Sequence, residues 1–135
     1  MLKDKIVFIT GASSGIGAAC ARCFAKAGSK LLLCARQIDV LNSLSMKLQS
    51  QYAVEVHTFK LDVRKHVKIQ EAFKALPEKW KKIDVLVNNA GLAAGLDTIQ
   101  EGSIQDWEDM IDTNMKGLLY ATKAVLPQMI ERNSG

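Results

Sequence analysis

Four short apolar runs alternate along the chain with longer segments in which apolar residues recur every three or four positions. The runs are rich in β-branched residues and leucine, which is typical of strands buried on both faces of a parallel sheet. The predicted strands are 5–10, 30–35, 54–61 and 83–88. The third of these alternates more between apolar and polar residues, so we expect it nearer the edge of the sheet.

The segments between the strands have the periodicity of amphipathic helices. The first helix is expected to start at Ile16 and to end at Gly28, and Asp39 is expected to cap the second. Pro77 closes the third, and a long fourth helix is predicted from Ile104 to Met129. The apolar stripe predicted for the first helix consists of Ile16, Ala19, Cys20, Cys23, Phe24 and Ala27.

Alternation of strands and helices predicts an α/β fold, a Rossmann-type doubly wound parallel sheet with helices on both faces. The expected strand order is 3-2-1-4, with a ligand bound across the crevice at the carboxyl ends of the strands. No linker, low-complexity stretch or second domain interrupts residues 1–135, which we interpret as a single domain.

A glycine-rich turn, Thr10-Gly11-Ala12-Ser13-Ser14-Gly15-Ile16-Gly17, joins the first strand to the first helix. Strand, glycine turn and helix together direct free backbone N–H groups and the positive end of a helix at a pyrophosphate. Glycine is needed where a side chain would obstruct the ligand or the packing of helix on strand. The turn therefore predicts a dinucleotide site, and an ordinary tight turn between strand and helix is the alternative.

The end of the second predicted strand indicates which dinucleotide is bound. Sites selective for NAD place a carboxylate there to accept hydrogen bonds from the ribose 2′-hydroxyl, about twenty residues after the glycines. Here Arg36 stands nineteen residues after Gly17 (36 − 17), and the strand end carries no carboxylate. A 2′-phosphate requires a cation, so we predict NADP as the cofactor.

Four motifs carry a family resemblance. Thr10-Gly11-x-x-x-Gly15-x-Gly17, Leu61-Asp62-Val63, Asn88-Asn89-Ala90-Gly91 and Asn114 resemble, in order and spacing, those of the short-chain dehydrogenase/reductase family. The resemblance extends from Lys3 to Gly135. Residues 106–127 look like the branch of that family that acts on serine and other 3-hydroxy acids.

The resemblance implies roles for individual residues. The backbone of Ser13, Ser14, Gly15 and Ile16 would hold the pyrophosphate, and Asp62, beside the Val63 backbone, would accept a hydrogen bond from the adenine amino group. Asn88 would brace the fourth strand, and Asn89, Ala90 and Gly91 would line the adenosine ribose. Taken singly, Asp62 can also be a solvated loop residue, and the asparagine pair can be turn chemistry.

The resemblance also implies hydride transfer between a nicotinamide and an alcohol or carbonyl carbon. Family members use a tyrosine, a lysine four residues later, a serine on strand five and an asparagine that holds water. Asn114 matches only the last of these, because Tyr52 and Tyr120 are followed four positions later by Val56 and Ala124. We therefore expect an oxidoreductase truncated before strand five and inactive as this chain alone; a non-catalytic NADP-binding module is the alternative.

Charge and composition predict an ordinary domain with small-molecule partners. The net charge is only +4, and we interpret Lys79-Trp80-Lys81-Lys82 as a solvated helix end and not as a nucleic-acid site. No apolar run approaches the length of a membrane span, and no signal peptide precedes the first strand, so we expect a cytoplasmic protein. The family resemblance further implies a homo-oligomer for the full-length form.

Three cysteines remain to be explained. Cys20 and Cys23 have the C-x-x-C spacing of some metal and redox sites, but they fall on one predicted helix without a second ligand pair. We interpret both, together with Cys34, as buried reduced thiols and predict no metal site.

Overall fold

The computed structural model describes all 135 residues as an alternating series of strands and helical segments. Its β-branched and leucine-rich runs form the strands, and a helix lies between each strand and the next. The elements are β1 (Ile6–Thr10), α1 (Gly15–Lys26), β2 (Lys30–Ala35), α2 (Ile38–Tyr52), β3 (Val56–Lys60), α3 (His66–Ala75), a 3-10 turn (Glu78–Trp80), β4 (Val85–Val87), α4 (Ile104–Ile111), a π-helical segment (Asp112–Gly117) and α5 (Leu118–Glu131).

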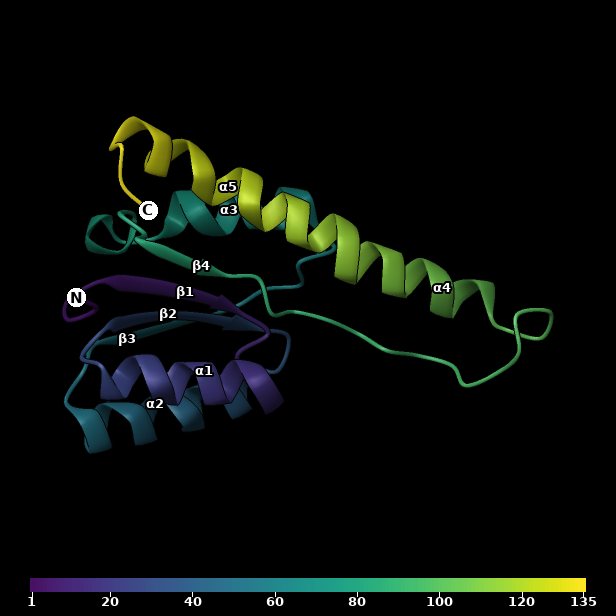
Figure 1. Ribbon diagram of the computed structural model, residues 1–135, viewed down its shortest axis with the longest axis horizontal. Helices are drawn as coiled ribbons and strands as arrows, with labels where there is room; N and C mark the ends of the chain where they lie inside the picture. Colours follow the sequence, from purple (N-terminus) through teal and green to yellow (C-terminus); the bar gives the residue numbers. More distant parts are fainter.

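The four strands form one parallel sheet in the order β3-β2-β1-β4, which confirms the predicted Rossmann-type topology. Helices α1 and α2 cover one face, and α3 and α5 cover the other (Figure 1). Each face has its own apolar core, one built around Val7, Ile9 and Leu33 and the other around Phe8 and Leu32. The central strands β1 and β2 are therefore apolar on both sides, as the sequence pattern required.

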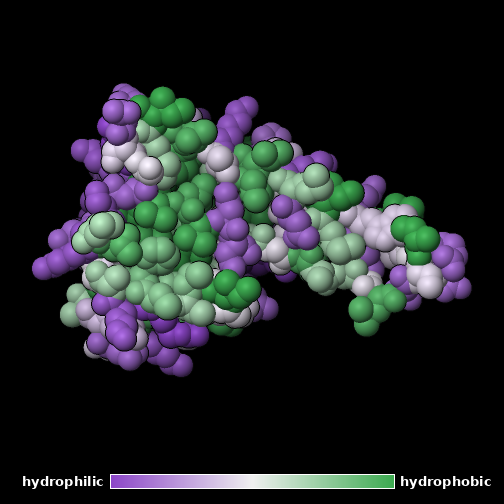
Figure 2. Space-filling model, in the orientation of Figure 1, coloured by the Kyte–Doolittle hydropathy of each residue, from purple (hydrophilic) through white to green (hydrophobic).

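Strand β4 is shorter than the predicted 83–88 and pairs with β1 along one edge only. Its three apolar residues Val85, Leu86 and Val87 are each half-buried. Hydrophobic residues gather between the two helix layers, on the side of the molecule where β4 lies (Figure 2).

Helix α1 presents a different face to the sheet from the one predicted. Its buried residues are Gly17, Ala18, Ala21 and Ala25, whereas Ile16 is 76% exposed. The helix lies close to the sheet because small residues face it. Of the predicted stripe, Cys20 and Phe24 still pack, half-buried, against the core on this face, whereas the other members are exposed. The predicted extent was nearly right, since Gly28 follows the helix end with φ of 81°.

The long fourth helix is confirmed in extent but is not uniform. A π-helical segment of six residues separates α4 from α5, and α4, which has no buried residue, projects away from the sheet (Figure 1). Asp39 does not cap α2: Gln37 occupies the cap position, and Asp39 lies in the first turn, where its charge still favours the helix dipole.

Trp80 is only 3% exposed and packs in the core, so the predicted solvated helix end is wrong for this residue. None of the helices combines the length and the apolar character that crossing a bilayer would require. No three histidine, cysteine or acidic side chains gather as a metal-binding group would.

The cysteines differ in environment, which corrects the expectation that all three are buried. Cys34 in β2 is fully buried, Cys20 is half-buried and Cys23 is exposed. The face that α1 presents to the sheet explains Cys23, because this residue lies outside it. Burial raises the pKa of the Cys34 thiol to about 12, and a hydrogen bond from the Gly11 backbone opposes that rise only in part.

The three thiols should therefore react at different rates. At pH 8 we expect a disulfide reagent such as DTNB to modify Cys23 rapidly and Cys34 only after unfolding, because Cys34 is both buried and protonated. Cys23→Ser should abolish the fast phase observed by absorbance. Rapid modification of Cys34 in a variant lacking Cys20 and Cys23 would contradict this packing.

Candidate functional site

A cavity of about 730 Å³ opens where the carboxyl ends of all four strands meet. The sequence-predicted residues that line it are Gly11, Ser13, Ser14, Gly15, Ile16, Arg36, Asp62, Val63, Asn89, Ala90 and Gly91. The remaining lining residues, Ala35, Gln37, Leu61 and Thr113, were not predicted. Two predicted residues, Gly17 and Asn114, lie outside the cavity.

The three glycines of the turn have different reasons for being glycine. Gly11 and Gly15 adopt left-handed backbone conformations, with φ of 62° and 52°. A Cβ on Gly11 would lie 2.8 Å from the Ala90 Cα, and one on Gly17 would overlap the Asn89 side chain and the Gly11 carbonyl. A Cβ on Gly15 would meet nothing within 4 Å. Gly17 thus acts through packing, and Gly15 borders open space in the cavity wall.

Helix α1 begins at this turn with its N-terminal amide groups left for a ligand. Ser14 is the N-cap residue, yet its side chain makes no capping hydrogen bond, and the first turn contains no acidic residue. The first N–H groups of a helix have no partner within the helix, and they favour an anion. The amide-lined turn and the open space at Gly15 together fit a phosphate group.

Thr10 and Asn89 join the ends of the two strands that flank the cavity. The Thr10 hydroxyl is buried and accepts hydrogen bonds from the Asn89 and Ala90 backbone N–H groups, at 3.1 and 3.0 Å. The Asn89 side-chain amide donates to the carbonyls of Thr10 and Gly11, each at 3.0 Å. The turn after β1 and the segment after β4 are thereby held as one unit.

The neighbouring Asn88 makes a different contact from Asn89. Its side-chain amide donates to the Thr122 hydroxyl at 2.9 Å, which joins the end of β4 to α5. The end of the fourth strand is thus tied to α5 through Asn88, in keeping with the bracing expected of this residue, and to the turn after β1 through Asn89.

Arg36 follows β2 directly, is exposed, and lines the cavity. It has no partner among the ion pairs of the structure, and no carboxylate occupies the strand end. The guanidinium is available to a ligand.

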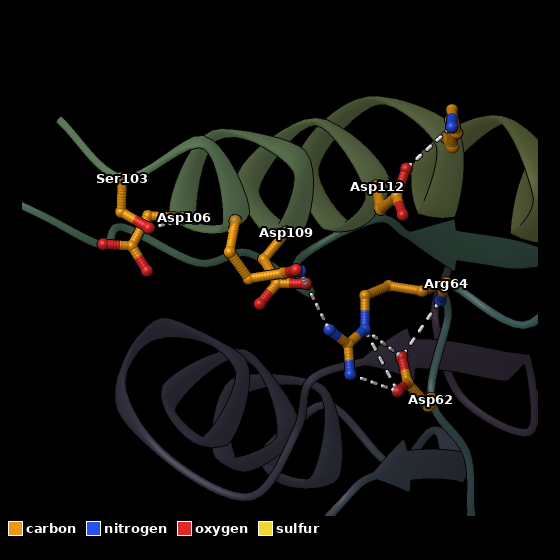
Figure 3. Close-up of polar contacts among 8 residues, drawn as sticks. Asp62, Arg64, Ser103, Asp106, Asp109 and Asp112 are labelled. Atoms are coloured by element: carbon orange, nitrogen blue, oxygen red, sulfur yellow. Dashed lines mark hydrogen bonds and ion pairs between the residues drawn. The ribbon is translucent and has the colours of Figure 1, made fainter. Parts of the chain in front are cut away.

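Asp62 lies across the same cavity, after β3, and is held by Arg64 (Figure 3). Hydrogen bonding to Arg64 lowers the pKa of the Asp62 carboxyl, the burial of that carboxyl opposes the shift, and the charge of Arg36 adds to it. The carboxylate is therefore ionised at neutral pH and can only accept hydrogen bonds.

Residues 5–135 match the family model of the short chain dehydrogenases. The chain belongs to this family. It is 48% identical over 130 residues to the NADP-dependent 3-hydroxy acid dehydrogenase YdfG of Salmonella typhi, covering 96% of this chain and 51% of that protein. It is 47% identical over 132 residues to sulfoacetaldehyde reductase 2 of Chromohalobacter salexigens, covering 98% and 52%.

Solved structures of the short-chain dehydrogenase family have the same fold. The closed form of serine dehydrogenase complexed with NADP⁺ superimposes with a TM-score of 0.87 at 44% identity, covering 96% of this chain and 51% of that one. The chain thus spans about half the length of the curated relatives it matches.

Asn114, the one catalytic residue suggested by resemblance to the family, lies in the π-helical segment and not in the cavity wall. Its side-chain oxygen accepts from the Leu92 N–H at 2.7 Å, and its amide donates to the Leu92 carbonyl at 2.8 Å. Both ends of the side chain are thus engaged with the segment after β4. A π-helical turn shifts backbone carbonyls out of the regular ladder and frequently marks a functional position.

Several residues at the site escaped the sequence prediction. Thr113 comes from the far end of the chain, and Arg64 reaches Asp109 across 45 positions. Thr10 was recognised only as part of the glycine motif, although its position as the last residue of a buried strand could have marked its hydroxyl as needing partners.

The Thr10 hydroxyl should have a measurable effect on stability. Thr10→Val keeps the shape of the side chain but leaves two N–H groups without an acceptor, each costing about 1–3 kcal/mol. We expect the free energy of unfolding in urea to fall by about 2–4 kcal/mol. Thr58→Val is the matched control, because its hydroxyl bonds Asn42 at the surface; equal losses in the two variants would contradict the role of Thr10.

Proposed function

We propose that this chain is the NADP-binding part of a short-chain oxidoreductase that transfers hydride between the nicotinamide and an alcohol or carbonyl carbon. The observation that carries the proposal is the position of Arg36. Its guanidinium shares one cavity with the amide-lined turn, and no carboxylate competes with it at the end of β2. The named NADP dependence of the Salmonella relative and the NADP⁺ complex of serine dehydrogenase support this proposal.

The residues present fit this cofactor. Amides of Ser13 to Ile16 would hold the pyrophosphate, and Arg36 would contact the 2′-phosphate. Leu61 and Val63 offer apolar surface to the adenine, and Asp62 offers an acceptor for its amino group. The ribose would be lined by Asn89, Ala90 and Gly91. The Thr10 hydroxyl fixes the position of this backbone by accepting hydrogen bonds from the N–H groups of residues 89 and 90.

The proposed substrate class is a 3-hydroxy acid or the corresponding carbonyl compound. It rests on the likeness of residues 106–127 to that branch and on the name of the Salmonella relative. The bound cofactor would supply the hydride chemistry. Asn114 would hold the segment after β4 in place and, by family resemblance, a water molecule for proton transfer.

We further propose that the tyrosine, lysine and serine of the reaction lie outside these 135 residues. Neither Tyr52 nor Tyr120 is followed by a lysine four positions later, and Tyr120 packs against the His66 ring. The same observation supports a second candidate, a non-catalytic NADP-binding module. A homo-oligomeric full-length form is also proposed, on the family resemblance alone, and a cytoplasmic location is proposed from the sequence features described above.

Replacing Arg36 should change cofactor preference. Charge-assisted hydrogen bonds contribute about 1.5–3 kcal/mol, so Arg36→Gln should weaken NADPH binding about ten- to a hundred-fold and leave NADH nearly unchanged. Isothermal titration calorimetry measures both. Arg22→Gln on α1, exposed and outside the cavity, is the matched control. Tighter binding of NADH than NADPH to the unaltered protein would contradict the cofactor assignment.

The 135-residue chain should bind NADPH without oxidising it. With 3-oxo acids as acceptors, absorbance at 340 nm should stay constant, because no group in the chain matches the tyrosine–lysine pair. Sustained NADPH oxidation that requires the acceptor would refute the assignment of the catalytic groups to other residues.

A further inference from the structure

We infer that Arg64 positions the Asp62 carboxylate to receive an adenine amino group, and that Asp109 of α4 in turn holds Arg64. The inference rests on the proposed function, because it presupposes an adenine nucleotide in the cavity. It assigns a role to two residues that lie outside the cavity wall.

Arg64 holds Asp62 from one side with three N–H groups. Its Nη2 donates to Asp62 Oδ2 at 2.7 Å, and its Nε lies 3.0 and 3.1 Å from the two carboxylate oxygens. Its backbone N–H donates to Oδ1 at 3.1 Å. A planar guanidinium that contacts both oxygens fixes the plane of the carboxylate as well as its charge.

This clamp leaves capacity for one more donor. A carboxylate has about four acceptor positions, and Arg64 brings only three N–H groups to it, of which the Nε–H is shared between the two oxygens. Asp62 itself borders the cavity, and its side chain is 25% exposed. The remaining position suits an N–H donor on a ligand, and the apolar Leu61 and Val63 beside it suit a flat base.

Asp109 completes the arrangement from another part of the chain. Its Oδ1 accepts from Arg64 Nη1 at 2.9 Å and from Gln105 Nε2 at 3.2 Å. Figure 3 shows the guanidinium lying between the two carboxylates, one from the loop after β3 and one from α4. Because α4 buries no residue of its own, this ion pair fastens the projecting helix to the binding site.

A ligand lacking one amino group tests the inference directly. In the hypoxanthine analogue of NADPH, the adenine amino group is replaced by a carbonyl, which cannot donate to Asp62. The unaltered protein should bind NADPH about ten-fold more tightly than this analogue, as expected for a hydrogen bond to a charged group. Binding of each is followed by the fluorescence of the reduced nicotinamide.

Arg64→Gln should reduce this preference to about two-fold or less, because the carboxylate is no longer held in one orientation. Affinity for the analogue should change little, since the analogue makes no use of the group that Arg64 positions. Asp109→Asn should reduce the preference in the same direction but less, and Arg22→Gln should leave it at ten-fold. Thermal melting of each variant verifies that it folds; if Arg64→Gln does not fold, Asp109→Asn carries the test.

The outcomes separate this inference from the proposed function. Equal weakening of NADPH and its analogue by Arg64→Gln indicates a merely structural role and overturns the inference. A full ten-fold preference in both variants overturns it as well, as does the lack of any preference in the unaltered protein. Failure of the unaltered protein to bind NADPH at all would instead refute the proposed function.

Discussion

Thr10 and Asn89 face each other where the two strands beside the cavity end, and their hydrogen bonds bring β1, the glycine turn and the β4 segment together. Four bonds of 3.0–3.1 Å meet at this point, and the Thr10 hydroxyl that accepts two of them is buried. The exclusion of water makes each unmade bond costly, so the two segments have a single favourable arrangement. This arrangement also explains why Gly11 and Gly17 carry no side chain. A Cβ atom at either position would collide with residues 89 and 90 or with the turn itself.

Charge around the cavity is arranged as an alternating series from the solvent-facing Arg36 through Asp62 and Arg64 to Asp109. The contribution of such partly exposed pairs to stability is small. Their effect on geometry is larger, because Arg64 contacts both oxygens of Asp62 and holds that carboxylate in one orientation. Arg36 forms no ion pair with Asp62, although its charge is near enough to help lower the pKa of the Asp62 carboxyl. The same series links the loop after β3 to α4, a helix that has no buried residue.

The topology and most of the cavity wall followed from the sequence because they depend on local signals: apolar strands, a glycine turn, and polar residues directly after each strand. Contacts that depend on how closely a helix approaches the sheet could not be predicted from the sequence. Large apolar residues suggested one face of α1, but close approach to the sheet favoured the alanine face, which left Ile16 and Cys23 outside. The apolar pattern of the long helix suggested one stripe, whereas the π-helical segment shifts the residues after it by roughly one position around the axis. Arg64 could not be paired with Asp109 from spacing, because a long side chain can reach any neighbour that the fold provides.

Gly15 is a position where the absence of a side chain matters for ligand binding and not for packing of the folded chain. Its neighbours leave the place of a side chain empty, and its φ of 52° is one that asparagine or aspartate also tolerates. A homologue that acquired asparagine here would fold and melt much as its ancestor did while its phosphate pocket was blocked. Loss of ligand binding at this position would therefore be silent in any screen that measures stability alone, and drift toward a purely structural protein could begin there unnoticed.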